Sequence, residues 1–344
     1  MISPLLGGIE QAFLDYTKAL SSYNHQVLDI ICKHAQIKEK IPLEKESILE
    51  ISFLHYNYFL VIYLYLKLRK FKPDLIIVHN KKAIPIFRML AKLLKTKIVG
   101  VSHNPKYKHI GTCDGIFTIT QYQKDIFSLK GFPQDKIFVI PNLIEQTLPF
   151  KPAKEFHNPP IIGTMGRFDP MKGFGDFVQA LFILKQQNIP FHAIIGGGVQ
   201  KSYQEEYDNI RKLTNDLNLK NDITFCGWVH DKNAFFNNID IFVLPSRFEP
   251  FGIVLLEAMM YSKPIVSSLA EGPAEIFAST PDAAYLFPVK DPLALAEKLT
   301  QALQDFSKTK EIAHNGYNLC LNNYTLENVA LKLHNAVSTF KKER

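Results

Sequence analysis

Short runs of β-branched and other apolar residues alternate with longer amphipathic stretches along nearly all of the 344-residue chain. The short runs predict buried strands, and the longer stretches, with apolar residues three and four positions apart, predict helices that cover a sheet. This order is typical of repeated βα units on parallel sheets. The expected strands are 25–32, 74–79, 97–101, 115–120 and 136–140 in the first half, and 161–165, 191–196, 222–227, 240–245, 264–268 and 284–287 in the second.

The same pattern predicts helices at 175–187, 203–217 and 292–305, and a linker at 142–160, where periodicity is lost and four prolines occur. We therefore expect two Rossmann-like, doubly wound α/β domains. Their expected bounds are 1–150 and 151–324, followed by a C-terminal helix in 325–344 that packs back on the N-terminal domain. Ligands of such folds lie at the C-terminal ends of the strands, here in an interdomain cleft.

The first domain opens unusually. A doubly wound domain normally begins with a strand that leads into its first glycine-rich loop, but Gly7-Gly8 follows Met1 by only six residues. The loss of a central strand would expose two unpaired sheet edges. We therefore expect that the first strand is missing here and that the natural protein begins further upstream.

Charge is distributed unevenly between the two halves. Residues 1–150 hold 20 basic and 12 acidic residues, a net +8, whereas residues 151–344 hold 20 and 21, a net −1. Within 67–108 there are twelve basic residues and one acid, Asp74. Such a field attracts nucleic acid, phospholipid headgroups or phosphorylated substrates, although a solvated lysine-rich surface is an equal alternative.

The cysteines and the apolar runs indicate in which cellular compartment the chain is expected. The four cysteines are far apart, without CxxC pairs or zinc-like histidine spacing, which is typical of reduced thiols in a cytoplasmic protein. The N-terminal residues lack the basic segment and unbroken apolar run of a signal peptide. The apolar run 51–68 contains His55 and Asn57, so we expect a buried or interfacial helix there rather than a membrane span.

The strongest chemical motif is the stretch 245–259, in which a strand end and a turn with Glu249 precede a helix that starts near Gly252. Free N–H groups at a helix start form an anion cradle; here they belong to Phe251, Gly252 and Ile253. Glu257 lies about 7.5 Å further along the helix axis. The two carboxylates can hold hydroxyls of a sugar and of a ribose. The alternative is one loop glutamate and one ordinary helix glutamate.

A further motif, Gly166-Arg-Phe-Asp-Pro-Met-Lys-Gly173, directly follows the expected strand 161–165. Arg167 offers a planar fork and Lys172 a point charge, and two cations at this spacing suit a diphosphate. The alternative is a surface turn with two incidental cations.

These motifs together resemble those of the retaining glycosyltransferases of family 4, whose fold is GT-B, and the resemblance covers nearly the whole chain. The features that carry it are Gly7-Gly8, the strand 74–79 that ends at His79, Gly166-Arg167 to Lys172-Gly173, the run 240–246, and the Glu249 to Glu257 pair with Pro-Phe-Gly between its members.

The resemblance implies transfer of a sugar, most simply a hexose, from a nucleotide diphosphate sugar to an acceptor with retention at the anomeric carbon. Arg167 and Lys172 would neutralise the leaving diphosphate, Glu249 would contact the donor sugar, and Glu257 would hold the ribose. The same resemblance places His103 near the donor sugar and acceptor, the backbone of Trp228 and Val229 against the base, and Gly8 in a loop close to the phosphates.

Fixed cations and helix amides at the phosphate stabilise the charge of a leaving diphosphate without a metal. The chain contains no Asp-x-Asp, which argues against a divalent cation, and we expect no cofactor beyond the donor substrate. The alternatives are an epimerase or phosphorylase on the same fold, a dinucleotide enzyme that uses Gly196-Gly-Gly198, and a non-catalytic relative that binds nucleotide sugar without transfer.

We further expect the acceptor to be a glycan or a lipid-linked molecule, in the synthesis of lipopolysaccharide or another cell-surface polysaccharide. The lysine-rich helices and the aromatic run 56–65 would then rest on an anionic bilayer, so the expected location is cytoplasmic, peripheral on the inner face of the membrane. Nucleic acid is not an expected partner, since no recognition motif accompanies the charge.

Overall fold

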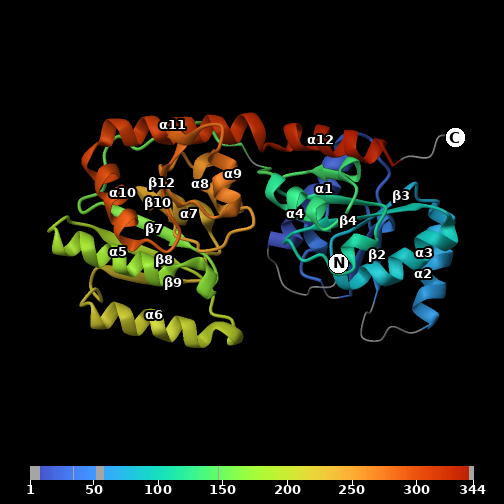
Figure 1. Ribbon diagram of the computed structural model, residues 1–344, viewed down its shortest axis with the longest axis horizontal. Coiled ribbons are helices and arrows are strands. Elements are labelled where there is room, and N and C mark those ends of the chain that lie inside the picture. Colours follow the sequence, from blue (N-terminus) through green and yellow to red (C-terminus); the bar gives the residue numbers. More distant parts are fainter. Residues whose placement is uncertain (1–7, 34, 52–57, 146, 341–344) are drawn as a thin grey trace. The chain divides into compact units, whose positions relative to one another are not determined.

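Parallel sheets form the centre of both halves of the chain. The computed structural model describes residues 8–33, 35–51, 58–145 and 147–340, and it divides into unit 1 (Met1–Glu145 and Tyr324–Arg344) and unit 2 (Gln146–Asn323) (Figure 1). The first boundary falls five residues before the expected one. The reason is local, because the N–H of Ile144 donates to the carbonyl of Tyr324 over 2.8 Å and keeps residues up to 145 with unit 1.

Unit 2 contains a six-stranded parallel sheet in the order β12-β11-β10-β7-β8-β9. The order reverses beside β7, because β8 and β9 extend the sheet on one side and β10 to β12 on the other. The strands are β7 (Ile161–Met165), β8 (His192–Gly196), β9 (Ile223–Gly227), β10 (Ile241–Leu244), β11 (Ile265–Ser268) and β12 (Tyr285–Phe287).

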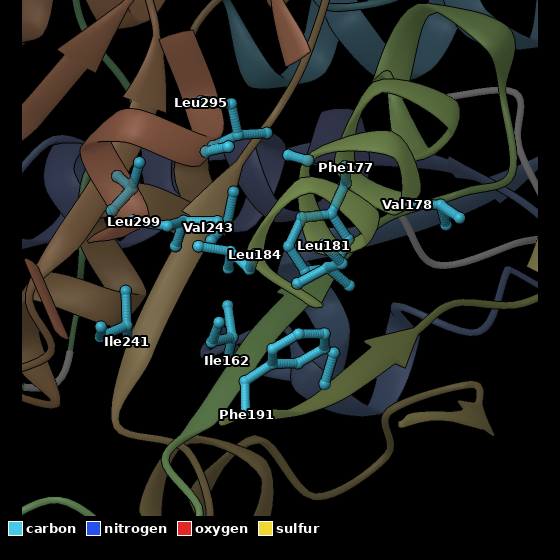
Figure 2. Close-up of a cluster of buried hydrophobic side chains, with 14 of the residues drawn as sticks. Ile162, Phe177, Val178, Leu181, Leu184, Phe191, Ile241, Val243, Leu295 and Leu299 are labelled. Carbon is cyan, nitrogen blue, oxygen red and sulfur yellow. The ribbon is translucent and has the colours of Figure 1, made fainter. Parts of the chain in front are cut away.

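The helices of unit 2 cover both faces of this sheet (Figure 1). On one face, α5, α6 and α10 contribute to a core with the strands, and Figure 2 shows how Phe177, Leu181 and Leu184 of α5 meet Leu295 and Leu299 of α10. The helices are α5 (Phe174–Gln186), α6 (Gln204–Asp216), α7 (Lys232–Asn237), α8 (Ile253–Met260), α9 (Glu271–Phe277), α10 (Pro292–Gln304) and α11 (Phe306–Asn323).

Unit 1 contains a four-stranded parallel sheet in the order β3-β4-β5-β6. Alternate residues of β3 enter different cores: Ile76 and Val78 pack with α2 and α3, whereas Leu75 and Ile77 pack with α1 and α12. The elements are β3 (Leu75–Val78), β4 (Lys97–Ser102), β5 (Gly115–Thr118), β6 (Ile137–Val139), α1 (Gly8–Ser22), α2 (Tyr58–Phe71), α3 (Ile84–Leu94), α4 (Gln121–Leu129) and α12 (Leu326–Ser338).

A second, two-stranded parallel ladder in unit 1 joins β1 (Asp29–Cys32) to β2 (Ile48–Ile51). The sequence did not predict β2, and it wrongly placed Ile51 in a helix, because the short strand runs into the apolar stretch that follows. The helix of that stretch, α2, begins at Tyr58 and ends at Phe71, and no helix in the described part of the chain is long and apolar enough to cross a bilayer. The segment before Gly8, on which the expectation of a missing first strand rests, lies outside the described residues.

Two glycines of unit 2 share a left-handed backbone but differ in the space around them. Gly173 has φ +68° and an added Cβ would lie 2.0 Å from the Pro245 carbonyl oxygen, whereas Gly227 has φ +71° with nothing within 4 Å of such an atom. We expect Gly227→Ala to cost about 1 kcal/mol in the free energy of unfolding, the cost of a left-handed backbone. Gly173→Ala must also move a strand end, so we expect a loss of about 3 kcal/mol.

Urea denaturation of each variant, followed by the fluorescence of Trp228, the one tryptophan of the sequence, measures both losses in the same unit. Equal losses for the two variants would contradict the close approach of the loop to Pro245.

Candidate functional site

The two motifs of the second half come together at the point where the strand order of unit 2 reverses. The first motif loop, 166–173, leaves β7, and the second, 245–252, leaves the neighbouring strand β10. Ligands of open parallel sheets bind beside the C-terminal ends of strands at such a reversal, because the connections diverge to opposite faces and leave a crevice. The sheet topology therefore places both loops at the expected binding edge of unit 2.

Direct backbone contacts join these two loops. The carbonyl of Met171 accepts hydrogen bonds from the N–H groups of Arg247 at 2.8 Å and of Phe248 at 3.3 Å. Gly173 packs against the carbonyl of Pro245, an approach that leaves no room for a side chain. We call this set of contacts the loop seam.

An ion pair that the sequence did not predict reinforces the loop seam. Arg247 donates from Nε and Nη2 to the two carboxylate oxygens of Asp176 in the first turn of α5, at 2.8 and 2.6 Å. The Asp176 side chain is 6% exposed, and its hydrogen bonds raise the pKa of Arg247. Such a two-pronged geometry fixes the direction of both side chains. The scarcity of arginine, six in the chain, was the available signal for Arg247, but nothing marked Asp176 as its partner.

Lys172 and Glu249 extend from the loop seam and meet each other. The Lys172 Nζ lies 2.6 Å from Glu249 Oε2, and the side chains are 21% and 10% exposed. Arg167 is half exposed, and its Nη2 lies 3.8 Å from Asp169 Oδ2. The motif loop therefore carries one cation held by a carboxylate and one that projects largely into solvent.

The backbone around Glu249 is fixed by the start of α9. The N–H of Gly272 donates to the Glu249 carbonyl at 2.8 Å, and a Cβ on Gly272 would lie 2.4 Å from Phe251 Cα. Gly252, at φ +99°, then turns the chain into α8. The N–H groups of Gly252 and Ile253 donate to none of the described residues, so they are available to an anion.

Glu257 lies one turn further into α8 and forms an ion pair with Lys232, the first residue of α7. The Glu257 side chain is 13% exposed and that of Lys232 is 49% exposed. Both predicted carboxylates of the second motif thus have a lysine partner.

The loop after β9 packs against glycines at the end of β8 and directly after it. Added Cβ atoms would lie 2.5 Å from the Val229 side chain at Gly196 and 2.5 Å from the Trp228 ring at Gly198. Trp228 remains 49% exposed, which is unusual for an indole and leaves one part of the ring open to a ligand. Gly197 approaches the carbonyl of Gly166, so the segment that follows β8 contacts the motif loop 166–173.

Unit 1 carries the two predicted histidines, which stack on each other. His79 follows β3 and His103 follows β4, and their ring centroids are 5.5 Å apart. Tyr16 of α1 meets the His79 ring edge-on at 4.7 Å. The Nδ1 atom of His79 and the Nε2 atom of His103 are buried without a hydrogen-bond partner among the described residues.

Burial keeps both histidines neutral. It lowers the pKa of His103 to about 4, with a further contribution from the charge of Lys81, and it lowers the pKa of His79 well below the usual range. Lys81 donates to the carbonyl and side-chain oxygens of Asn104 at 2.9 and 2.8 Å, and burial lowers its own pKa to about 8. A neutral imidazole can accept a hydrogen bond from a hydroxyl group.

Gly8, the remaining predicted residue, is exposed and begins α1 in unit 1, while Gly7 lies outside the described residues. In unit 2 the structure gathers one set of predicted residues around the loop seam and another around the ends of β8 and β9. The first set is Arg167, Lys172, Glu249, Phe251, Gly252 and Ile253, and the second is Trp228 and Val229, with Glu257 on α8.

Comparisons with known proteins place this arrangement in a family. A family model described as Glycosyl transferases group 1 matches residues 146–319, and one described as Glycosyltransferase Family 4 matches residues 6–147. The lipopolysaccharide core biosynthesis glycosyltransferase LpsE of Rhizobium meliloti is 30% identical over 168 residues, which are 49% of this chain and 46% of that protein. The capsular polysaccharide biosynthesis glycosyltransferase CapM of Staphylococcus aureus is 23% identical over 264 residues, 75% of this chain and 65% of that protein.

The aligned stretches therefore span between about half and two thirds of these curated relatives. Among solved structures, Anabaena Alr3699/HepE in complex with UDP and glucose has a TM-score of 0.82 and 19% identity over 98% of both chains. That likeness confirms the predicted GT-B fold with two Rossmann-like domains. Since the first family model covers half of the chain and the second most of the remainder, the chain belongs to the glycosyl transferases group 1 family.

Proposed function

We propose that the chain is a retaining glycosyltransferase that moves a sugar from a nucleotide diphosphate sugar to a glycan or lipid-linked acceptor. Family membership supports the reaction class. The observation that carries the donor class is the grouping of Arg167, Lys172 and the first turn of α8 beside the loop seam.

The leaving group sets the main requirement of this reaction. When the bond between the anomeric carbon and the diphosphate breaks, negative charge grows on the phosphate oxygens and positive charge on the sugar ring. Donors fixed beforehand at the position of the growing charge stabilise the transition state. Arg167, Lys172 and the N–H groups of Gly252 and Ile253 supply such donors, and the loop seam joins the two loops from which they extend.

Lys172 and Glu249 bind each other in the structure, and they would bind different parts of the donor. A diphosphate that binds Lys172 replaces the carboxylate as its partner. Glu249 is then able to accept hydrogen bonds from hydroxyls of the donor sugar, close to the ring that becomes positive. Glu257 would bind the ribose hydroxyls in the same way after exchange from Lys232.

The base-directed end of the donor would rest on the loop of Trp228 and Val229. UDP is the nucleotide in the complex of the Anabaena protein, which supports a nucleotide as the ligand that we propose for this loop. A comparison of UDP-, GDP- and ADP-sugars as substrates identifies the base and sugar of the donor. We propose that no metal takes part, since the protein's own cations and N–H groups face the diphosphate.

The curated relatives indicate the biosynthetic process in which the proposed reaction would take place. The two curated relatives act in lipopolysaccharide core and capsular polysaccharide biosynthesis. We therefore propose a role in the synthesis of lipopolysaccharide or another surface polysaccharide. In unit 1 we assign neutral His103 to the donor sugar and acceptor, because its buried Nε2 is able to accept a hydroxyl proton in a hydrogen bond.

Removal of Lys172 or Glu249 tests the donor site. We expect radiolabelled UDP-, GDP- or ADP-sugar to be hydrolysed slowly without acceptor, and Lys172→Ala and Glu249→Ala each to lower that rate roughly a hundredfold or more, because each removes a charge from the transition state. Lys212→Ala, an exposed lysine on α6, is the control and should leave the rate unchanged. Addition of EDTA should not change the rate. Donor binding without turnover in any acceptor extract would contradict the proposed transfer.

The stereochemical outcome is a separate prediction. For a UDP-α-sugar that the chain accepts, we expect the new linkage to be α, because the proposed reaction retains the configuration. Proton NMR of the product during the first turnovers measures the anomeric coupling. A β-linked product would show inversion and would overturn this part of the proposal while leaving the donor site intact.

The neutral state of His103 is tested by stability against pH. A folded pKa of about 4 lies below the unfolded value of about 6.5, so protons favour the unfolded state, and stability present at neutral pH is lost as pH falls from 6.5 towards 4. For His103 alone this loss is about 2 kcal/mol between pH 7 and pH 5. We expect His103→Gln to lose less stability than the natural chain over this interval, by that amount.

Urea denaturation at both pH values is followed by circular dichroism, which reports on both units, and by Trp228 fluorescence, which reports on unit 2 and should give the same midpoints in both proteins. A difference seen by circular dichroism alone then belongs to unit 1. Replacement of exposed His230 by glutamine is the control. An unchanged pH dependence in His103→Gln would mean that the pKa of His103 is the same in the folded and unfolded states, which would contradict the lowered pKa.

A further inference from the structure

Helix α2 of unit 1 has two apolar stripes, and only one of them faces the core. The inward stripe includes Leu64 and Leu68, which are 0% and 3% exposed and pack with β3 and α3. The outward stripe is Phe59, Ile62, Tyr63 and Leu66, at the i, i+3, i+4, i+7 spacing of one helix face, with exposed fractions of 78%, 39%, 42% and 57%. A helix normally places polar residues on this second face.

Basic residues continue the outward stripe toward the end of the helix. Lys67 and Lys70 follow Tyr63 and Leu66 at the same spacing and are exposed. The Lys67 Nζ lies 5.7 Å from the centre of the Tyr63 ring, which places its charge beside the aromatic surface.

The neighbouring helix α3 extends this surface. It packs against α2, and both helices cover the face of the sheet that contains Ile76 and Val78, so their solvent sides belong to one layer (Figure 1). On α3, Met89 and Leu93 are 43% and 57% exposed. Arg88 and Lys92 are exposed beside them. We call the outward residues of these two helices the α2–α3 surface.

The charge of this surface selects among the partners that an exposed apolar stripe could have. Residues 58–97 contain ten basic residues and one acid, Asp74. A second copy of this surface would bring like charges together. A bilayer with anionic headgroups matches both the basic residues and the apolar side chains, which enter the boundary between headgroups and acyl chains.

We propose that the α2–α3 surface docks on an anionic lipid bilayer, with α2 lying in the plane of the interface. Fourteen residues of helix are about 21 Å long, short of the roughly 30 Å of a hydrocarbon core, so the helix lies on the bilayer rather than across it. Phe59 and Leu66 insert, while Lys67 and Lys70 contact phosphate groups. This goes beyond the proposed transfer reaction, and it would bring the chain to a lipid-linked acceptor.

Vesicle flotation tests the proposal without any donor or acceptor, so its outcome is independent of the transfer assay. The vesicles are phosphatidylglycerol and phosphatidylcholine in equal parts, or phosphatidylcholine alone. We expect the full chain to float with the mixed vesicles at 0.1 M NaCl, to bind more weakly at 0.5 M, and to remain unbound with phosphatidylcholine.

Paired variants separate the two contributions. Lys67→Glu with Lys70→Glu should weaken binding by about 25-fold or more, from roughly fivefold per basic residue. Phe59→Ser with Leu66→Ser should weaken it at least about tenfold through lost apolar burial. Leu293→Ser on α10 of unit 2, also 57% exposed, is the matched control and should bind like the natural chain.

Because all four replaced side chains are exposed, the variants should keep the natural melting temperature, which circular dichroism checks. Three results would overturn the proposal. These are absence of flotation with the mixed vesicles, flotation that neither paired variant changes, and light scattering that shows a dimer lost in Phe59→Ser with Leu66→Ser.

Discussion

The candidate donor site depends on the seam between the loops that follow β7 and β10. These loops are joined by the hydrogen bonds from Arg247 and Phe248 to Met171, by the bidentate pair of Arg247 with Asp176, and by the approach of Gly173 to Pro245. These contacts tie the backbones of the two loops to each other. Preorganised charges stabilise a transition state because they need not be reoriented when charge develops. The seam therefore brings the donors of two separate loops together at one edge of the sheet.

The polar side chains at the strand ends differ in charge between the two units. Around the loop seam, each buried carboxylate has a partly exposed cation as its partner, and this pairing offsets the cost of burying the charge. At the strand ends of unit 1, by contrast, His79 and His103 lie among Tyr16 and Phe13 and keep uncharged rings. Burial thus keeps the two imidazole rings of unit 1 neutral, so that they act through hydrogen bonds. The corresponding side chains of unit 2 stay charged, because each is paired with an opposite charge. This division matches a donor with a charged diphosphate and an acceptor that offers hydroxyl groups.

The sequence predicted those features that depend on local pattern. The strand 161–165 was predicted with its exact bounds, and α10 differs by one residue, because each is a periodic run between clear turn residues. The strand β2 was missed, since four residues that include Glu50 merge with the apolar run that follows. Lys172 and Glu249 were predicted individually, whereas Arg247 was not singled out. Their pairings could not be predicted, because the partners lie 71 to 77 positions apart and meet only through the strand order of the sheet.

The ion pairs of Lys172 with Glu249 and of Lys232 with Glu257 also bear on selectivity. In each pair a carboxylate of the protein already binds the lysine, so an anion from solution has to compete with that carboxylate for the same positive charge. A free phosphate ion would have to displace that carboxylate and would leave it without a new partner. The proposed donor, a nucleotide diphosphate sugar, would offer hydroxyl groups to both displaced glutamates and phosphate oxygens to the lysines. In the proposed site, the two ion pairs would therefore favour a ligand with both chemistries over small anions that can replace the carboxylates but cannot bind to them.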